Sequence, residues 1–454
     1  MGGGAGSDEG AIRQDDVVAM DVVADEAMLI AGRTIQGVGA GGMYVLLDIV
    51  CADLVPLRER GKYLGLMFSW SGLAAALGPV VVGALAEANW RWIFYLNIPI
   101  CAVALVAILL FMRVKSGAHP NHTSPLPSPP SRLDYLGTLI FIPSMISLLL
   151  GLIQGGVDHP WSSWHIITPL ILGIMGWIIF HIQQTLTSTP SIPPHLFTTR
   201  TSATAYLLTF LSSILVQALS YFLPIYFQAV HATTVPRSGI SFLPFAIGTL
   251  FFAVLAGTLL SVFGAYRPLH AIAFAFSAVS FGLLTLLDES STTVEWVFYQ
   301  LIAAVGAGMI LSVLLPAIMA ALPERDVAAA TAAYSFVRTF GYIWGVTVAS
   351  VVFDAVVGGE LAGVRDARVR GELERGGAYA FASQMHGMKG VMGEDEWKVV
   401  VGVYVKGLRI VWWVGLGISC LRLGAVWMAK GLELRKELET EYGIDEGEKR
   451  GDTS

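Results

Sequence analysis

The chain has 454 residues, of which 55% are hydrophobic and only 14% charged, and its mean hydropathy is +0.65. Soluble domains carry about 25% charged residues, so this composition excludes an ordinary soluble protein and favours one embedded in lipid. The net charge of −6 comes without the basic stripe that phosphate backbones require, so no nucleic-acid partner is expected. Three cysteines without C-x-x-C spacing indicate neither a disulfide framework nor a metal site.

Eleven apolar segments predict transmembrane helices, because each is near the roughly twenty residues that a bilayer requires. Their approximate ranges are 28–50, 62–86, 92–112, 134–154, 164–184, 203–223, 239–263, 268–287, 295–320, 330–354 and 408–430. None shows the alternation of barrel strands, so the expected fold class is an all-α polytopic membrane protein.

Composition along the chain predicts its organisation. We expect a disordered acidic segment over 1–26, a partial N-terminal bundle of three helices over 27–113, a Pro- and Ser-rich linker over 114–133, an inserted helix pair over 134–185, a six-helix C-terminal bundle over 186–430 with a long outer loop over 357–405, and a tail over 431–454. Basic residues in the short loops place the linker and the tail in the cytoplasm, although arginines within 357–405 partly oppose this orientation.

One pattern occurs twice in the chain at a constant separation of 267 positions. Gly39 and Gly41 recur as Gly306 and Gly308, and a charged turn opened by Pro follows each pair. Parallel repeats of whole helix bundles are how many secondary transporters are built. The alternative is coincidence among abundant glycines and alanines, which the matching charged turns make less attractive.

Arg33 lies inside the first span, where a cation costs at least about 2.5–3.5 kcal/mol near the bilayer centre. We interpret Arg33, with Gln36 one turn later, as lining a transport path coupled to protonation. Snorkelling to the interface is the alternative. The equivalent residue in the second copy is Gln300, which is polar but neutral. Arg338, about two turns into the tenth span, allows the same two interpretations.

Small residues dominate two helices of the first half. Gly37, Gly39 and Gly41 leave one helix face without side chains, which suits close helix packing and leaves direct substrate contact as the alternative. In the second span a Gly-Pro pair predicts a kink that serves either a gate or a fixed bend. The residues of this kink motif are Gly72, Gly78, Pro79 and Gly83.

The end of the first span and the following turn carry charges of both signs. Asp53 can pair with Arg58 or Arg60, which predicts a cytoplasmic latch; a solvated charge run is the alternative. The aromatic segment 221–228 fits either a pocket for an apolar substrate or an interfacial aromatic belt. No P-loop, H-E-x-x-H or G-x-S-x-G motif occurs, so neither an enzyme nor a cofactor is expected.

Together these features resemble the major facilitator superfamily, and more narrowly its fungal fourteen-helix drug:proton antiporters. The segments that carry the resemblance are 31–42, 53–63, 72–83, 90–99, 223–228, 330–332 and 336–341. The paired glycine usual in the antiporter motif is Val82-Gly83 here. The resemblance covers about residues 27–430, and it implies that Arg33 matches an arginine implicated in proton coupling.

The resemblance implies a pseudo-two-fold bundle that exports small apolar organic compounds (drugs, toxins or secondary metabolites) in exchange for protons. It favours the plasma membrane over the vacuolar membrane. The family's first three helices are expected upstream of residue 27 and have no counterpart there. The alternatives are therefore a truncated, non-transporting remnant, an uptake carrier of the same fold and, least favoured, a membrane-embedded enzyme.

Overall fold

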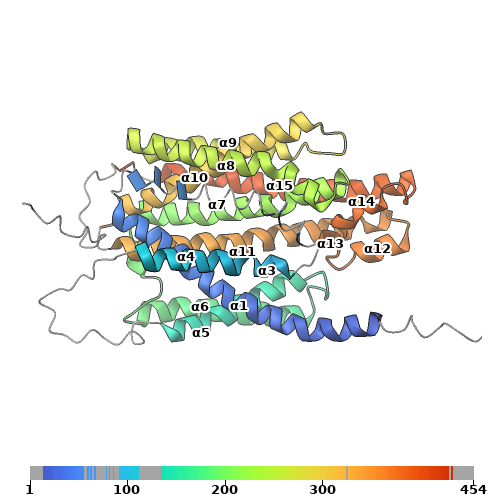
Figure 1. Cartoon of the computed structure of the whole chain (residues 1–454), viewed down its shortest axis with the longest axis horizontal. Helices are drawn as coiled ribbons and strands as arrows, with labels where there is room; N and C mark the ends of the chain where they lie inside the picture. The colour runs from blue at the N-terminus through green and yellow to red at the C-terminus, as the bar shows by residue number, and fades with distance from the viewer. Residues whose placement is uncertain are drawn as a thin grey trace, which may run out of the picture.

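The computed structural model describes residues 14–55, 59–60, 62–63, 66–67, 78, 81, 85, 91–111, 134–323, 326–428 and 431–432. It consists of helices that run roughly parallel to one long axis (Figure 1). The α-helices are α1 (Gln14–Leu54), α3 (Trp92–Tyr95), α4 (Asn97–Phe111), α5 (Tyr135–Gln154), α6 (Trp164–Leu186), α7 (Arg200–Ile225), α8 (Val235–Phe263), α9 (Tyr266–Leu284), α10 (Thr293–Ala320), α11 (Val327–Glu360), α12 (Ala367–Leu373), α13 (Ala378–Phe381), α14 (Met385–Met388) and α15 (Glu394–Ala425). Five short 3-10 or π-helical pieces are η2 (Pro194–Phe197), η3 (Tyr226–Val230), η5 (Leu361–Gly363), η6 (Ala382–Gln384) and η7 (Val426–Met428).

Within the described residues, nine helical segments are long and apolar enough to cross a membrane. They correspond to nine of the eleven predicted spans, and the expected all-helical membrane protein is confirmed. The predicted span 92–112 is broken at Leu96 into α3 and the shorter apolar helix Asn97–Leu110. Most of the predicted span 62–86 lies outside the described residues.

Three helix boundaries differ from the expectations. Helix α1 begins at Gln14, inside the segment 1–26 that we expected to be disordered. Asp15 and Asp16 lie in its first turn, and carboxylates near a helix N-terminus are favoured by the helix dipole. Helices α11 and α15 extend into the predicted loop 357–405, so the non-spanning part is shorter than expected.

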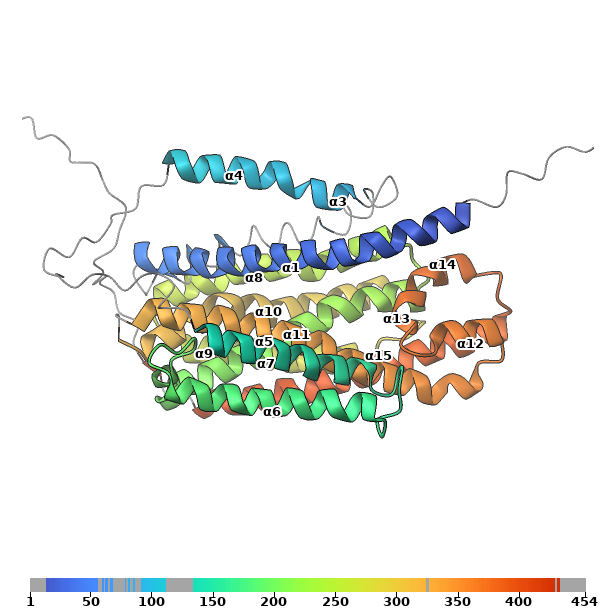
Figure 2. The same cartoon turned by 90° about the horizontal axis from the view of Figure 1, so that it is seen from below.

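Helices α7 to α11 and α15 form the largest packed unit. Helix α10 lies against α8 and α9, α11 against α7, and α15 against both α9 and α11. Two clusters of buried apolar side chains fill this bundle. One includes Phe222, Phe353 and Trp412; the other includes Tyr206, Phe274 and Met319. Helices α1 and α4 lie on one side of the bundle (Figure 2), with α1 packed against α11.

Helices α5 and α6 form a separate pair that contacts the bundle through α11. The Phe141 ring of α5 packs against Phe336 and Phe340 at centroid distances of 5.5 and 6.0 Å. Asp134 caps α5 by accepting a hydrogen bond from the Gly137 N–H at 2.8 Å, and it also accepts one from the Gln183 amide of α6 at 2.9 Å. Burial opposes ionisation of Asp134, but these and further amide and hydroxyl bonds outweigh it and lower its pKa.

One end of the bundle carries a small helical cap, residues 361–393, built from η5, α12, α13, η6 and α14 (Figures 1 and 2). Its apolar side chains, among them Leu373, Phe381 and Met385, join the same buried cluster as α15. At this end of the bundle α10 starts with a capping box, in which Thr292 and Glu295 satisfy each other's backbone N–H groups.

Candidate functional site

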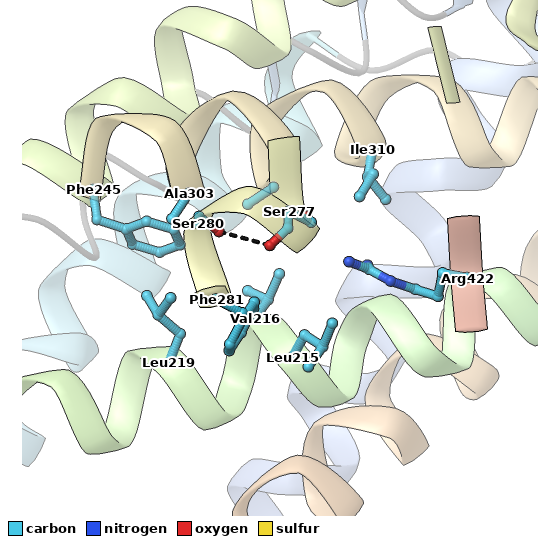
Figure 3. A pocket seen from close by; sticks show the side chains of 11 residues that line it. Leu215, Val216, Leu219, Phe245, Ser277, Ser280, Phe281, Ala303, Ile310 and Arg422 are labelled. Carbon is cyan, nitrogen blue, oxygen red and sulfur yellow. Dashed lines mark hydrogen bonds between the residues drawn. The ribbon is translucent and has the colours of Figure 1, made fainter. Parts of the chain in front are cut away.

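A small cavity lies inside the bundle, where α7, α8, α9, α10 and α15 meet (Figure 3). Its walls are mostly apolar and carry two serines and one arginine. The lining residues are Leu215, Val216, Leu219, Phe245, Ser277, Ser280, Phe281, Ala303, Ala307, Ile310 and Arg422. It has room for about one water-sized body.

Glycines of α10 allow the walls of this cavity to come together. A methyl group built on Gly306 would lie 2.9 Å from the Ala273 carbonyl oxygen of α9, and one on Gly308 would lie 2.9 Å from the Ala253 nitrogen of α8. Ser312, one turn after Gly308, donates a hydrogen bond to the Ala253 carbonyl at 2.8 Å. The helices therefore touch backbone to backbone here, as is common for small-residue faces in membranes.

Arg422 is the most unusual residue of the cavity, because its side chain is charged and only 1% exposed. Its Nη1 donates a hydrogen bond to Ser212 Oγ of α7 at 2.9 Å, and its guanidinium carbon lies 4.9 Å from the centre of the Phe274 ring. The Ser212 hydroxyl itself donates to the Leu208 carbonyl, so its oxygen is available as an acceptor. The remaining donors of Arg422, Nε and Nη2, have no acceptor in the part of the chain that the structure describes.

The guanidinium of Arg422 reaches the middle of the bundle although its Cα is close to a helix end. Arg422 is in the last turn of α15. Side chains on a helix lean towards its N-terminus, which here means away from the nearer end. Its partner Ser212 is twelve residues into α7, about 18 Å from the helix start. This direction is opposite to snorkelling.

His270 adds a second buried ionisable group close to this region. It is 2% exposed, its ring is stacked near Phe274 at a centroid distance of 5.8 Å, and its Nε2 has no hydrogen-bond partner among the described residues. Phe274 therefore stands between an imidazole and a guanidinium. The arrangement concentrates basic groups, and the described residues place no carboxylate within ion-pair distance of Arg422.

The predicted path residues of the second half lie elsewhere in the same bundle. Gln300 is fully buried and donates a hydrogen bond from Nε2 to the Ser241 carbonyl at 3.0 Å. Arg338 is 5% exposed, and its guanidinium lies 5.1 Å from the centre of the Tyr334 ring. The structure does not bring Gln300 and Arg338 into contact.

The predicted path residues of the first half lie on the exposed part of α1. Arg33 donates a hydrogen bond from Nη1 to Gln36 Oε1 at 2.9 Å, so these two are brought together. No described atom lies within 4 Å of a methyl group built on Gly37, Gly39, Gly41 or Gly78. Gly72, Pro79 and Gly83 lie outside the described residues.

Of the predicted latch, the structure describes the Arg60 side chain, while Arg58 and the Asp53 side chain lie outside the described residues. Arg60 is 1% exposed and donates hydrogen bonds from Nε to the Val55 carbonyl at 2.7 Å and from Nη1 to Met319 Sδ at 3.1 Å. The basic turn after α1 is thus tied to the end of α10.

The side chains of the aromatic segment 221–228 differ in burial. Tyr226 and Phe227 are 1% exposed, whereas Tyr221 is 42% exposed. The Tyr226 hydroxyl donates to the Asp288 carbonyl at 2.9 Å and lies 2.9 Å from His231 Nε2. These residues anchor the cap end of α7 instead of lining the cavity.

Sequence reasoning missed Arg422 and His270. Arg422 did carry a signal, since it lies in the interior of the apolar segment 408–430, whose other two cations, Arg409 and Lys430, lie at its ends; Arg338 is likewise a cation inside an apolar span. His270 carried none, because a single histidine near a helix start has no distinctive spacing.

The chain is similar to a known protein family and to several named proteins. The family model described as "Major Facilitator Superfamily" matches residues 17–346. The chain is 43% identical over 429 residues to the MFS-type transporter gkaD of Penicillium citrinum, covering 94% of this chain and 73% of that protein. It is 42% identical over 430 residues to the MFS efflux transporter aclA of Aspergillus oryzae, covering 94% and 77%. It is 39% identical over 424 residues to the MFS-type efflux pump LUC4 of a Fusarium species, covering 92% and 74%.

Proposed function

This chain belongs to the major facilitator superfamily of multi-pass membrane transporters, and on that premise we propose that it exports small apolar organic compounds in exchange for protons. The observation that carries the proposal is the likeness to proteins named efflux transporter and efflux pump over 92–94% of the chain. We propose the plasma membrane as its site.

The transport cycle that we propose is alternating access, in which one helix bundle rocks against the other. Rocking needs parts that move as rigid bodies. The backbone contacts of Gly306 and Gly308 make α8, α9 and α10 such a body. The contact of Arg60 with Met319 is then a latch that closes one end of the path and must open in each cycle.

Within this cycle we propose that Arg33, Gln36, Gln300 and Arg338 belong to the transport path. The positive charge of an arginine inside a membrane favours the ionised form of a neighbouring acid and disfavours its protonated form. Such an arginine therefore links cargo binding to proton release. Arg338 supports this role best, because its guanidinium is buried about eleven residues into α11.

The test is a transport measurement with the full chain in sealed vesicles, using the fluorescent cation rhodamine 6G as the probe. We expect the dye to move against its gradient when an inward proton gradient is imposed, and a protonophore to abolish the movement. Arg338→Gln should reduce the gradient-driven rate to that of protein-free vesicles. Arg409→Gln, which removes an exposed arginine from α15, should leave it unchanged.

Three results contradict the proposal in different ways. Dye movement that ignores the proton gradient removes the proton coupling. Gradient-driven movement in the opposite direction identifies an uptake carrier. No movement by a folded chain, judged by a single cooperative thermal transition, favours the non-transporting alternative.

A further inference from the structure

We infer that Arg422 holds a small monovalent anion of halide size inside the C-terminal bundle. The inference does not depend on the direction of transport or on proton coupling. It rests on three features of the cavity between α7, α8, α9, α10 and α15: a cation with no carboxylate partner among the described residues, unused donors that point into the cavity, and a space that admits only a small occupant (Figure 3).

The first feature is the charge of Arg422. A guanidinium stays protonated under all ordinary conditions, so Arg422 cannot avoid the cost of burying a charge by losing its proton. Buried charges are normally paired, yet the contacts of Arg422 are a neutral hydroxyl and an aromatic ring. Neither the hydroxyl nor the ring neutralises the positive charge of Arg422, whereas a bound anion would neutralise it.

The second feature is the orientation of the unused donors. Nη1 is fixed by Ser212 Oγ, and the ring of Phe274 supports the guanidinium. These contacts hold Nε and Nη2 in place, and neither finds an acceptor among the residues that the structure describes. Figure 3 shows the guanidinium projecting from α15 into the cavity towards the wall that carries Ser277 and Ile310. A planar fork with free N–H groups on one edge is a ready anion ligand.

The third feature is size. The cavity has room for about one water-sized body, so it leaves no space for an organic cargo molecule or a tetrahedral oxyanion, and a halide is the smallest common anion that could enter it. The other walls are apolar side chains, together with the serines of α9. One of these, Ser280, already donates its hydroxyl hydrogen to the Ser277 carbonyl at 2.9 Å. The lining residues that the structure describes therefore offer neither a competing negative charge nor the many ligands that a hydrated ion would need.

Binding of the anion should affect the stability of the bundle. Arg422 and its anion would join α15 to α7 through Ser212 and to α9 through Phe274, so occupancy should stabilise the folded bundle. The experiment measures thermal unfolding of the purified full chain in detergent at constant ionic strength, with chloride or bromide replacing gluconate. We expect a saturable rise of about 3–6 °C in the unfolding temperature for either halide, and no saturable rise when sulfate replaces gluconate, because sulfate acts only through its general exclusion from the protein surface.

Variants separate the site from general salt effects. Arg422→Gln should unfold at a temperature that no longer depends on halide. Arg422→Lys keeps the charge without the planar fork, so its half-saturating bromide concentration should rise at least about tenfold. Arg409→Gln, the exposed arginine of the same helix, should respond as the unaltered protein does. If Arg422→Gln does not fold, the lysine variant and the anion series on the unaltered chain still test whether the halide binds at Arg422.

Three outcomes overturn the inference. The first is an unaltered chain without any halide-dependent shift, and the second is a shift that persists in Arg422→Gln. The third is displacement of bromide by benzoate at equal ionic strength, which would assign the guanidinium to the carboxylate of an organic molecule. In crystals grown with bromide, an anomalous peak beside Arg422 Nε would locate the ion directly.

Discussion

At the scale of single residues, the contact of Tyr226 with His231 links the cap end of the bundle to pH. The Tyr226 hydroxyl hydrogen bonds the Asp288 carbonyl, so the phenolic oxygen accepts from His231 Nε2–H. This network assigns the neutral Nε2–H tautomer. Burial lowers the pKa of His231, and the nearby positive charge of Lys389 lowers it further, while Asp288 acts in the opposite direction.

The lowered pKa of His231 predicts that the protein loses stability in acid. The folded protein binds fewer protons at this site than the unfolded chain does, so the contribution is fully present above the ordinary pKa of about 6.5. It is lost progressively as the pH falls below 6.5 and through the lowered value. We expect the unfolding temperature in detergent to drop by a few degrees between pH 7.5 and pH 5.

The matched comparison for this prediction uses two histidines. His231→Gln should flatten the acid-dependent part of the profile, because glutamine keeps a donor but cannot take up a proton. His165→Asn, at an exposed position at the start of α6, should leave the profile unchanged. An unaltered profile in His231→Gln would show that other groups carry the acid sensitivity.

At the scale of helices, the contact between α8 and α10 depends on the absence of one side chain. A methyl group on Gly308 would meet the Thr249 carbonyl and the Ala253 nitrogen, which are backbone atoms of α8 that cannot turn away. We therefore expect Gly308→Ala to destabilise the protein by about 1–3 kcal/mol, as overpacked cores do, and to lower its unfolding temperature.

A second glycine provides the control for Gly308. No described atom lies within 4 Å of a methyl group built on Gly282 of α9, so Gly282→Ala should be neutral or slightly stabilising. Equal unfolding temperatures for the two variants, measured by tryptophan fluorescence on heating, would argue against backbone contact between α8 and α10.

Hydropathy was sufficient to predict that these helices exist, but it did not predict where all of them end. The apolar stretch of α15 begins near residue 408, yet the helix starts at Glu394. Its first turns are amphipathic and pack their buried face, with Val400, Val401 and Tyr404, against the cap. A hydropathy window averages over both faces of a helix, so it overlooks a segment that is buried on only one of them.

The candidate site was predictable where residue type alone mattered and not where the direction of a side chain mattered. The recurrence of Gly39 and Gly41 singled out Gly306 and Gly308, and the structure places both against neighbouring backbones. The bilayer cost of a cation singled out Arg338, but Arg422 is close to a helix end, where the sequence gives no side-chain direction. Whether such a residue turns towards the interface or the interior depends on its partners, here Ser212 and Phe274.

At the scale of the whole molecule, the described contact between the first half and the C-terminal bundle includes the end of α1 and the turn after it. Cys51 of α1 is 5% exposed and belongs to the buried cluster that contains Met319 and Leu322. The nearby hydrogen bonds of Arg60, to the Val55 carbonyl and to Met319 Sδ, hold the turn over this cluster. If the halves rock during transport, this contact must open.

Opening of that contact should be visible as labelling of Cys51 by a membrane-impermeant maleimide, in a chain carrying Cys101→Ser and Cys420→Ser. The bond that crosses the contact goes to Met319 Sδ, a weak acceptor, so it contributes about 0.5–1.5 kcal/mol. Its loss in Arg60→Ala should therefore accelerate labelling by about twofold to tenfold, since each 1.4 kcal/mol is a factor of ten. Lys62→Ala, an exposed neighbour in the same turn, should label at the original rate. Rapid labelling before any substitution would mean that the contact is open at rest. A rate that Arg60→Ala does not change would mean that Arg60 does not hold it closed.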